Sequence, residues 1–278
     1  MKKKTIVNLG LVLLVGLMLT GCQKAGGTTA EEPSLVVSDQ TSESEIASEV
    51  TVEEEEGTWV LVGMTIDSKV NWYNYGKKMI SEYEYDDKGN LIKSVSKYED
   101  GSYMLGSIIE MEYDEDGDML KSTTYDEDGT IVTSSEYVWN KDKTECTVTC
   151  YDASGKANQT ISQSYNADKK LIKAAYETSY TEFIYDDHNN LKETISYSLD
   201  GSITGKCEYQ NEYDENDRLV KATYVNYSTD ETGNLYQPGG DSYSVMEYDD
   251  NGNLAKETSY SVDDDSVQFI NIYEYEKH

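Results

Sequence analysis

The sequence predicts an all-β domain built from antiparallel hairpins, and three observations support this prediction. A Tyr-Asp turn motif recurs from Gly57 onward, which indicates an array of one structural unit rather than a conventional enzyme core. Apolar and polar residues alternate before each motif, as they do in a half-buried strand. The composition agrees, because 25 tyrosines stand beside only 2 phenylalanines and 3 tryptophans, and tyrosine rings bury apolar area while their hydroxyls stay hydrated.

The first residues have the pattern of an export signal. Three lysines precede the apolar stretch 5–19, which is short for a membrane span and suits the apolar part of a signal peptide. The stretch ends in Leu19-Thr20-Gly21-Cys22, which resembles a bacterial lipobox. The resemblance implies that residues 1–21 are a lipoprotein signal peptide. It also implies that Cys22 carries diacylglycerol and holds the protein on the extracytoplasmic face of a bacterial membrane.

The segment 22–56 is predicted to be a disordered tether. After Cys22 it is rich in Ser, Thr and Glu, contains no aromatic residue and shows no sustained helix or strand period. Such a segment cannot bury enough surface to offset the chain entropy lost on folding. Repulsion among its acidic side chains should extend it. Residues 57–278 are then the one structural domain.

The repeated motif begins with Tyr and Asp or Asn, continues through a turn, and ends in an aliphatic residue or Met. Its clear copies are 85–91, 113–119, 165–171, 185–191, 213–219 and 248–254. Weaker copies lie at Trp139 and Tyr273. Most copies follow one another after 26 to 28 residues, with one step of 20 and one of 35.

Each repeat is interpreted as two strands and two turns. In the first copy, Asp86 opens the turn by capping backbone N–H groups, and Gly89 supplies the left-handed conformation of a type I turn with a G1 bulge. A second strand over 91–98 follows, and a second turn at 99–102 closes the unit. Two strands of about nine residues and two turns of about four account for the period.

These motifs resemble the YD repeats, the Tyr-Asp-x-x-Gly-Asn/Arg-Leu arrays of bacterial RHS-type proteins and teneurins. The likeness covers about residues 83–278 and implies strands that coil into a sheet, which in that family can enclose a hollow shell. This chain is far shorter than such shells and lacks the family's Pro-containing self-cleaving core and toxin segment. We therefore expect an antiparallel β-meander of YD-like hairpin repeats that forms one curled or twisted sheet.

The charge of the chain argues against nucleic acid as a partner, because a formal net charge of −31 would repel a polyanion. We also predict no cofactor and no metal site. Asp114, Asp116 and Asp118 alternate like the first ligands of a calcium loop, but Gly117 and Tyr125 occupy the wrong loop positions. Turn chemistry explains these aspartates, and weak calcium binding at the crowded turns is the alternative.

Three cysteines follow Cys22 in the sequence. Cys146 and Cys150 are four residues apart on one predicted strand, about 13 Å, which is too far for a disulfide. Either one can pair with Cys207, and buried free thiols are the alternative. No Cys–His pair and no pair of carboxylates is singled out by the sequence, so we predict no catalytic residues.

The strongest candidate for ligand binding is the 35-residue step, the longest connection between two repeats. Long loops on a rigid sheet often carry recognition, and tyrosine faces stack on sugars or peptides. The candidate ligand-binding residues are Tyr227, Tyr236 and Tyr243. A neutral surface insertion is the alternative interpretation.

Together these features predict a membrane-anchored extracytoplasmic lipoprotein that acts as a non-catalytic binding or scaffolding module. Its expected partners are the membrane, through Cys22, and a cell-wall glycan or a surface protein. Two other functions fit the sequence as well. One is a purely structural surface spacer, and the other is a cell-envelope hydrolase whose carboxylate site no motif marks.

Overall fold

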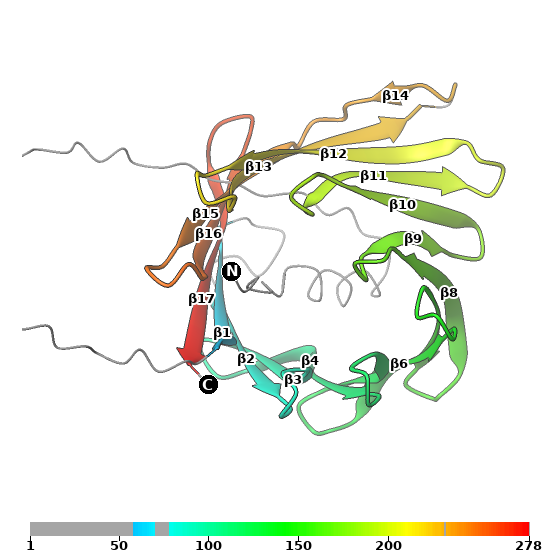
Figure 1. Cartoon of the computed structure of the whole chain (residues 1–278), viewed down its shortest axis with the longest axis vertical. Helices are drawn as coiled ribbons and strands as arrows, with labels where there is room; N and C mark the ends of the chain where they lie inside the picture. The colour runs from blue at the N-terminus through cyan, green and yellow to red at the C-terminus, as the bar shows by residue number, and fades with distance from the viewer. Residues whose placement is uncertain (1–57, 70–77, 231, 278) are drawn as a thin grey trace, which may run out of the picture.

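The computed structural model describes residues 58–69, 78–230 and 232–277, which form strands joined by turns (Figure 1). The predicted signal peptide, Cys22 and the predicted tether lie outside these residues. The strands are β1 (Trp59–Ser68), β2 (Lys78–Tyr85), β3 (Leu91–Tyr98), β4 (Tyr103–Tyr113), β5 (Met119–Tyr125), β6 (Ile131–Trp139), β7 (Glu145–Asp152), β8 (Ala157–Tyr165), β9 (Leu171–Ala175), β10 (Ser179–Tyr185), β11 (Leu191–Ser198), β12 (Ile203–Tyr213), β13 (Leu219–Thr229), β14 (Leu235–Tyr236), β15 (Ser242–Tyr248), β16 (Leu254–Ser261) and β17 (Val267–Lys277). The described part of the chain has no helix with the length and apolarity needed to cross a membrane.

The strands form one antiparallel sheet that closes on itself. The first strand, β1, pairs with β2 on one side and with the last strand, β17, on the other. In the closing pair, Trp59 lies opposite Lys277 and Ser68 lies opposite Phe269. Strand β14 pairs with the end of β13, while β13 pairs directly with β15, so β14 stands outside the ring. The other strands make a sixteen-stranded antiparallel barrel.

The prediction of one curled or twisted sheet was therefore wrong, although the chain is all-β and its strands follow one another as antiparallel neighbours. An open sheet of this width would leave two strand edges with unpaired backbone groups, and closure into a barrel removes both edges. The chain is indeed short for a large shell. Sixteen strands are nevertheless enough to close a barrel that is wider than its own side chains.

The Tyr-Asp turns have the predicted geometry. The carboxylate of Asp86 accepts hydrogen bonds from the N–H groups of Lys88 at 2.9 Å and Asn90 at 2.8 Å, and Gly89 has a φ of 84°. The pairing of β2 with β3 shifts register at Tyr85, which marks the bulge. The sequence motif thus fixes the hairpin locally, before any long-range contact forms.

The turns of the motif copies named in the sequence analysis lie at one end of the barrel, because successive strands run in opposite directions. We call this end the Tyr-Asp rim. Its turns are 86–90, 114–118, 140–144, 166–170, 186–190, 214–218 and 249–253. Strand β1 begins and β17 ends at this same rim, as the pairing of Trp59 with Lys277 shows. The similar turns after Tyr125 and Tyr151 lie at the other end of the barrel.

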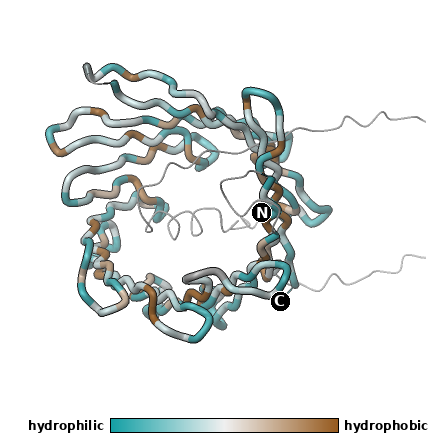
Figure 2. The backbone as a smooth tube through the Cα atoms, turned by 180° about the vertical axis from the view of Figure 1, so that it is seen from behind, coloured by the Kyte–Doolittle hydropathy of each residue, from teal (hydrophilic) through white to brown (hydrophobic). Residues whose placement is uncertain are grey.

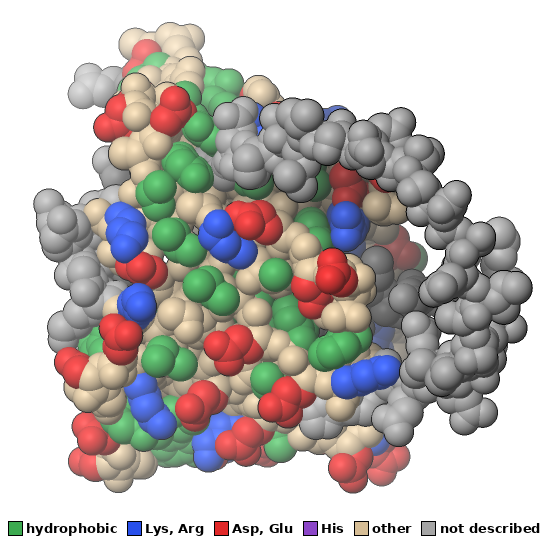
Figure 3. Space-filling view, turned by 90° about the vertical axis from the view of Figure 1, so that its left-hand side faces the viewer, with side chains coloured by type: hydrophobic (Ala, Val, Ile, Leu, Met, Phe, Trp, Pro, Cys, Tyr) green, Lys and Arg blue, Asp and Glu red, His purple; other side chains and the backbone are tan. Residues whose placement is uncertain are grey.

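Strand alternation places the charged residues on the outer wall of the barrel. Cross-strand ion pairs such as Lys93–Glu110, at 3.8 Å, and Lys173–Glu182, at 3.5 Å, recur from hairpin to hairpin. Figure 3 shows lysine and acidic side chains interspersed over the outside of the wall that contains β15 to β17. The residues that alternate with them form the inner wall. Away from strand ends and bulges, Glu257 is the one charged residue on the inner wall of the described strands.

The apolar residues of the inner wall form two clusters rather than one central core. One cluster spans β6 to β11 around Val148 and Ile161, which are 0% and 1% exposed. The other joins β1, β2 and β17 around Leu61 and Met64. Figure 2 shows short hydrophobic stretches spread around the ring rather than gathered at its centre. Stability is therefore distributed along the wall.

Near the Tyr-Asp rim, neighbouring hairpins are joined by side chains that bond to backbone carbonyl groups. The hydroxyl of Tyr113 on β4 donates to the carbonyl oxygen of Leu91 on β3 at 2.8 Å. Leu91 lies beyond the last registered pair of these strands, Lys93 with Glu110, so this carbonyl has no strand partner on the β4 side. Equivalent bonds join Tyr185 to Leu171, Tyr248 to Leu219, Trp139 to Met119 and Asn211 to Leu191. We call this set the side-chain–carbonyl ladder.

Removing one hydroxyl from this ladder should destabilise the barrel. In Tyr113→Phe, the carbonyl of Leu91 loses its donor while the ring stays in place. We expect the free energy of unfolding to fall by about 1 kcal/mol, measured by urea denaturation. The matched control is Tyr125→Phe, on the outer wall opposite Ile108. An equal loss in both variants would contradict a specific role for the ladder.

Candidate functional site

The three tyrosines predicted to bind a ligand do not meet at one site. Tyr227 lies on the outer wall and donates to Glu208 at 3.2 Å. Tyr243, also on the outer wall, stacks on Tyr260 with ring centroids 5.6 Å apart and donates to Asp265. Tyr236 lies on β14, outside the ring, and is 50% exposed. Their role as ligand contacts remains a prediction, and two of the three hydroxyls already have acidic partners.

The long step between repeats has a structural explanation. Strand β13 continues past its pairing with β15, which ends at Tyr224 opposite Ser242. The connection returns along this overhang, where β14 pairs with Ser228 and Thr229. Asp241, which is 8% exposed, accepts the N–H of Asn226 at 3.1 Å. The insertion thus covers a strand edge that would otherwise be open to pairing.

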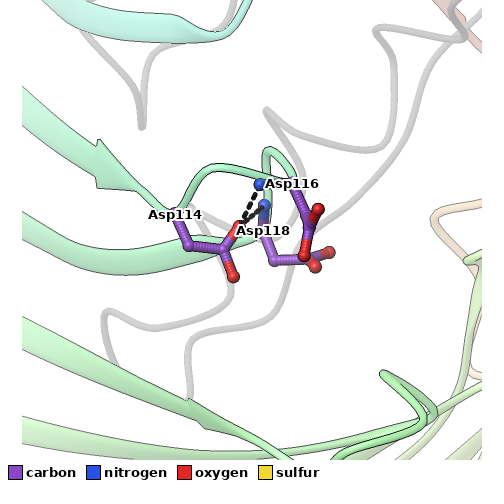
Figure 4. Close-up of side chains that lie close together, drawn as sticks. All are labelled: Asp114, Asp116 and Asp118. Atoms are coloured by element: carbon purple, nitrogen blue, oxygen red, sulfur yellow. Dashed lines mark hydrogen bonds between the residues drawn. The ribbon is translucent and has the colours of Figure 1, made fainter.

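The aspartates of the turn 114–118 do lie together, within 4.8 Å of one another (Figure 4). Asp114 accepts the N–H groups of Asp116 at 3.0 Å and Asp118 at 2.9 Å, which is ordinary turn chemistry. Two lysines pair with two of these three aspartates. Lys143 contacts Asp114 at 2.7 Å and Asp118 at 2.9 Å, and Lys169 contacts Asp118 at 2.9 Å. Ammonium groups therefore occupy the positions that a cation would take.

These ion pairs change the titration of the cluster. The hydrogen bond from Lys143 lowers the pKa of Asp114 from its ordinary 3.8 to about 2. Burial raises the pKa of Asp118, but the hydrogen bonds from Lys169 and Lys143 outweigh it, so this pKa is also lowered. Both carboxylates are ionised at neutral pH, and they join three turns of the Tyr-Asp rim.

The cysteines that the structure describes are free thiols. Cys146 and Cys150 point to the inner wall from β7, and Cys207 points inward from β12. Burial raises the pKa of Cys146 to about 11, which keeps this thiol protonated and unreactive. Cys207 lies 3.1 Å from the hydroxyl of Tyr224. The three thiols are free rather than paired, but only Cys146 is buried, whereas Cys150 and Cys207 are half-buried.

A site that the sequence analysis missed lies on the inner wall of β15, β16 and β17. Its centre is the half-buried carboxylate of Glu257. Oε1 of Glu257 accepts the hydroxyl of Ser244 at 2.5 Å. Oε2 accepts the hydroxyl of Tyr273 at 3.0 Å and the amide of Asn271 at 3.2 Å. We call these four residues the Glu257 site.

The Glu257 site has no positive charge of its own. Within the described residues, its three partners are all neutral donors, whereas neighbouring Glu247 pairs with Lys256 on the outer wall at 2.5 Å. Burial strongly raises the pKa of Tyr273, and Glu257 raises it further, so the phenol stays protonated as a donor. The site is a hydrogen-bonded carboxylate that still has unused acceptor capacity.

A signal for this site does exist in the sequence. Lys256 and Glu257 are consecutive charged residues within one half-buried strand. Side chains alternate between faces, so one of the two must point inward. The alternation that reveals the outer wall therefore also reveals its exception. This signal is hard to distinguish in the sequence because acidic residues in turns are far more numerous.

Besides the two apolar clusters, the inner wall carries many neutral polar and aromatic side chains. Register with the neighbours of Glu257 places these on the inner wall: Ser81, Ser94, Ser122, Ser135, Gln163, Thr181, Thr194, Asn226, Ser242, Ser244, Ser259, Asn271, Tyr83, Tyr137, Tyr209, Tyr224 and Tyr273. Such a surface offers hydroxyl and amide hydrogen bonds together with ring faces. It suits a polar ligand that carries hydroxyl groups.

No protein-family model and no curated protein matches the chain. A solved porin-like protein from Bacteroides uniformis is 13% identical, with a TM-score of 0.47 over 78% of this chain and 98% of that one. A porin-like protein from Bacteroides vulgatus is 11% identical, with a TM-score of 0.37 over 79% and 99%. The Photorhabdus luminescens Tc holotoxin pore is 12% identical, with a TM-score of 0.22 over 69% and 14%. All three TM-scores are below 0.5, so these likenesses establish no function.

Replacement of Lys143 tests the ion pairs of the Tyr-Asp rim. The lowered pKa of Asp114 means that its ionised form stabilises the fold above about pH 4, and that this contribution disappears as pH falls toward about 2. In Lys143→Met, we expect the loss of stability to be greatest at neutral pH and to shrink through this window. Urea denaturation at several pH values measures it. The control Lys93→Met breaks the exposed pair with Glu110, and a loss that does not depend on pH would contradict the assignment.

Proposed function

We propose that this chain is a lipid-anchored, extracytoplasmic and non-catalytic binding protein whose barrel takes a glycan against its inner wall. The observation that carries the proposal is the contrast between the two walls. The outer wall holds nearly all strand charges, paired across strands, whereas the inner wall is neutral, hydroxylated and aromatic. Sugars offer hydroxyl groups and apolar ring faces, and this inner wall complements both.

The outer wall supports a location in water rather than among lipid chains. A lipid-facing barrel wall carries an apolar band, and a lysine or arginine at its middle costs about 2–4 kcal/mol. Here Lys93, Lys173 and Lys256 lie within strands and pair with acids on neighbouring strands. Membrane attachment is assigned instead to the lipobox-like Cys22.

The geometry of the chain is compatible with this arrangement. Strand β1 starts at the Tyr-Asp rim, so residues 22–56 join the barrel at that end. This segment is acidic, as is the chain as a whole with its net charge of −31. An acidic barrel is repelled by an anionic membrane surface. Attachment through the lipid alone therefore leaves the barrel wall in water.

Blocking the inner wall tests the proposed binding face. Ala222 points inward opposite Ser244, and its neighbour Thr223 points outward opposite Tyr243. We expect Ala222→Trp to weaken glycan binding at least tenfold and Thr223→Trp to leave it unchanged, because only the first indole occupies the inner wall. Binding of both variants and of the wild-type chain is compared on an array that includes peptidoglycan fragments. No saturable hit for the wild type would favour the spacer function.

The anchor has its own test. We expect Cys22→Ala to move the protein from the membrane fraction to the soluble fraction, because the acceptor of diacylglycerol is gone. Fractionation at high salt measures this and removes charge-dependent attachment. Cys207→Ala is the control, since that thiol lies within the barrel. Continued membrane attachment of Cys22→Ala would contradict the lipobox assignment.

A further inference from the structure

The Glu257 site differs from the ion pairs of the outer wall because no lysine or arginine of the described residues contacts its carboxylate. The strand carboxylates that pair on the outer wall do so with lysines, as Glu247 does with Lys256 at 2.5 Å and Glu110 does with Lys93 at 3.8 Å. Among the described residues, the partners of the Glu257 carboxylate are Ser244, Asn271 and Tyr273, all of them neutral. Neutral donors stabilise a carboxylate without removing its charge, so the inner wall keeps one net negative charge at this position.

A second observation at the same place indicates an unfilled hydrogen-bonding position. Ser242 is on the inner wall of β15, two residues before Ser244, and is 0% exposed. Its hydroxyl has no hydrogen-bond partner among the described residues. A buried hydroxyl without a partner costs free energy, and such groups in native proteins usually bind a water molecule or a ligand. Ser244, two residues further along the same face of β15, is 1% exposed and donates to the carboxylate of Glu257.

The chemistry of the site selects among polar ligands. A neutral sugar would satisfy hydroxyl groups but would leave the charge of Glu257 uncompensated. A ligand ammonium group would form a charge-assisted hydrogen bond with the free acceptor capacity of the carboxylate. The adjacent Ser242 hydroxyl and the Tyr273 ring suit the hydroxyl groups and apolar face of a sugar ring.

We infer that the Glu257 site binds an amino sugar, with its ammonium group on the carboxylate of Glu257 and a ring hydroxyl on Ser242. This inference rests on the proposed function, because it names the ligand class of the inner wall. It also assigns a role to Glu257, the one charged residue on the inner wall of the described strands away from their ends and bulges. In this arrangement the ligand supplies the cation that Lys256 supplies to Glu247 on the other side of the wall.

The test compares four defined ligands by isothermal titration of the purified full-length chain. Glucosamine carries both groups, glucose and N-acetylglucosamine lack the ammonium, and ethanolamine lacks the sugar ring. At slightly acidic pH, where glucosamine is protonated, we expect it to bind about tenfold or more tightly than glucose and N-acetylglucosamine, since a charge-assisted hydrogen bond is worth about that factor. We also expect it to bind more tightly than ethanolamine, which keeps the ammonium group but lacks the ring face and ring hydroxyls. Equal binding of ethanolamine would overturn the assignment of a sugar, and equal binding of glucose would overturn the assignment of a charge.

Two matched variants locate the preference. Glu257→Gln should reduce the affinity for glucosamine to that for glucose, whereas Glu247→Gln, which changes a carboxylate on the outer wall of the adjoining strand, should leave the ratio unchanged. A preference for glucosamine that survives Glu257→Gln in a folded barrel, checked by circular dichroism, would overturn the inference. The ligand comparison on the wild-type chain remains decisive if this variant does not fold.

The outcomes separate this inference from the proposed function. If neutral glycans bind, Ala222→Trp blocks them and no ligand gains from an ammonium group, the inner wall is a glycan site and the role of Glu257 is refuted. If none of the four ligands binds, the amino-sugar assignment is refuted, and the array result for larger glycans decides the proposed function on its own.

Discussion

The barrel depends on how each hairpin satisfies the backbone of the hairpin before it. Near the Tyr-Asp rim, some strands carry a carbonyl beyond the last registered pair with the next hairpin, as at Leu91. A buried carbonyl without a donor is costly. The hydroxyl of Tyr113 supplies the donor, and Trp139, Tyr185, Tyr248 and Asn211 do the same elsewhere. These repeated bonds from a side chain to a carbonyl therefore favour a fixed offset between neighbouring hairpins.

That constraint also explains how the walls differ. The ladder needs its aromatic residues on the inner wall at the Tyr-Asp rim, so alternation sends the intervening residues outward. Lysine and glutamate fill these positions and pair across strands, as Lys93 does with Glu110. Each exposed pair adds little stability by itself. Pairs of opposite charge directly across neighbouring strands favour the observed register.

The sequence was sufficient for the features that are set within a few residues. The turn at Asp86 and Gly89 and the strands that flank it follow from local chemistry, and they were predicted correctly. The closure of the sheet into a barrel was not predicted. It depends on the pairing of β1 with β17, which joins the two ends of the domain and is encoded by no local pattern. Tyr227 and Tyr243 were chosen for exposure in a long loop. In the folded barrel their hydroxyls lie against Glu208 and Asp265, contacts that only the register of the strands creates.

Glu257 shows the reverse situation, a residue whose exceptional position follows from a local rule. A strand that carries Lys256 and Glu257 in succession must turn one charge inward. Placing a carboxylate on this wall costs desolvation free energy, which three hydrogen bonds from neutral donors help to offset. An uncharged residue at this position would avoid that cost and would keep the strand. A cationic ligand, as proposed above, would give this carboxylate the charge partner that the described residues do not supply.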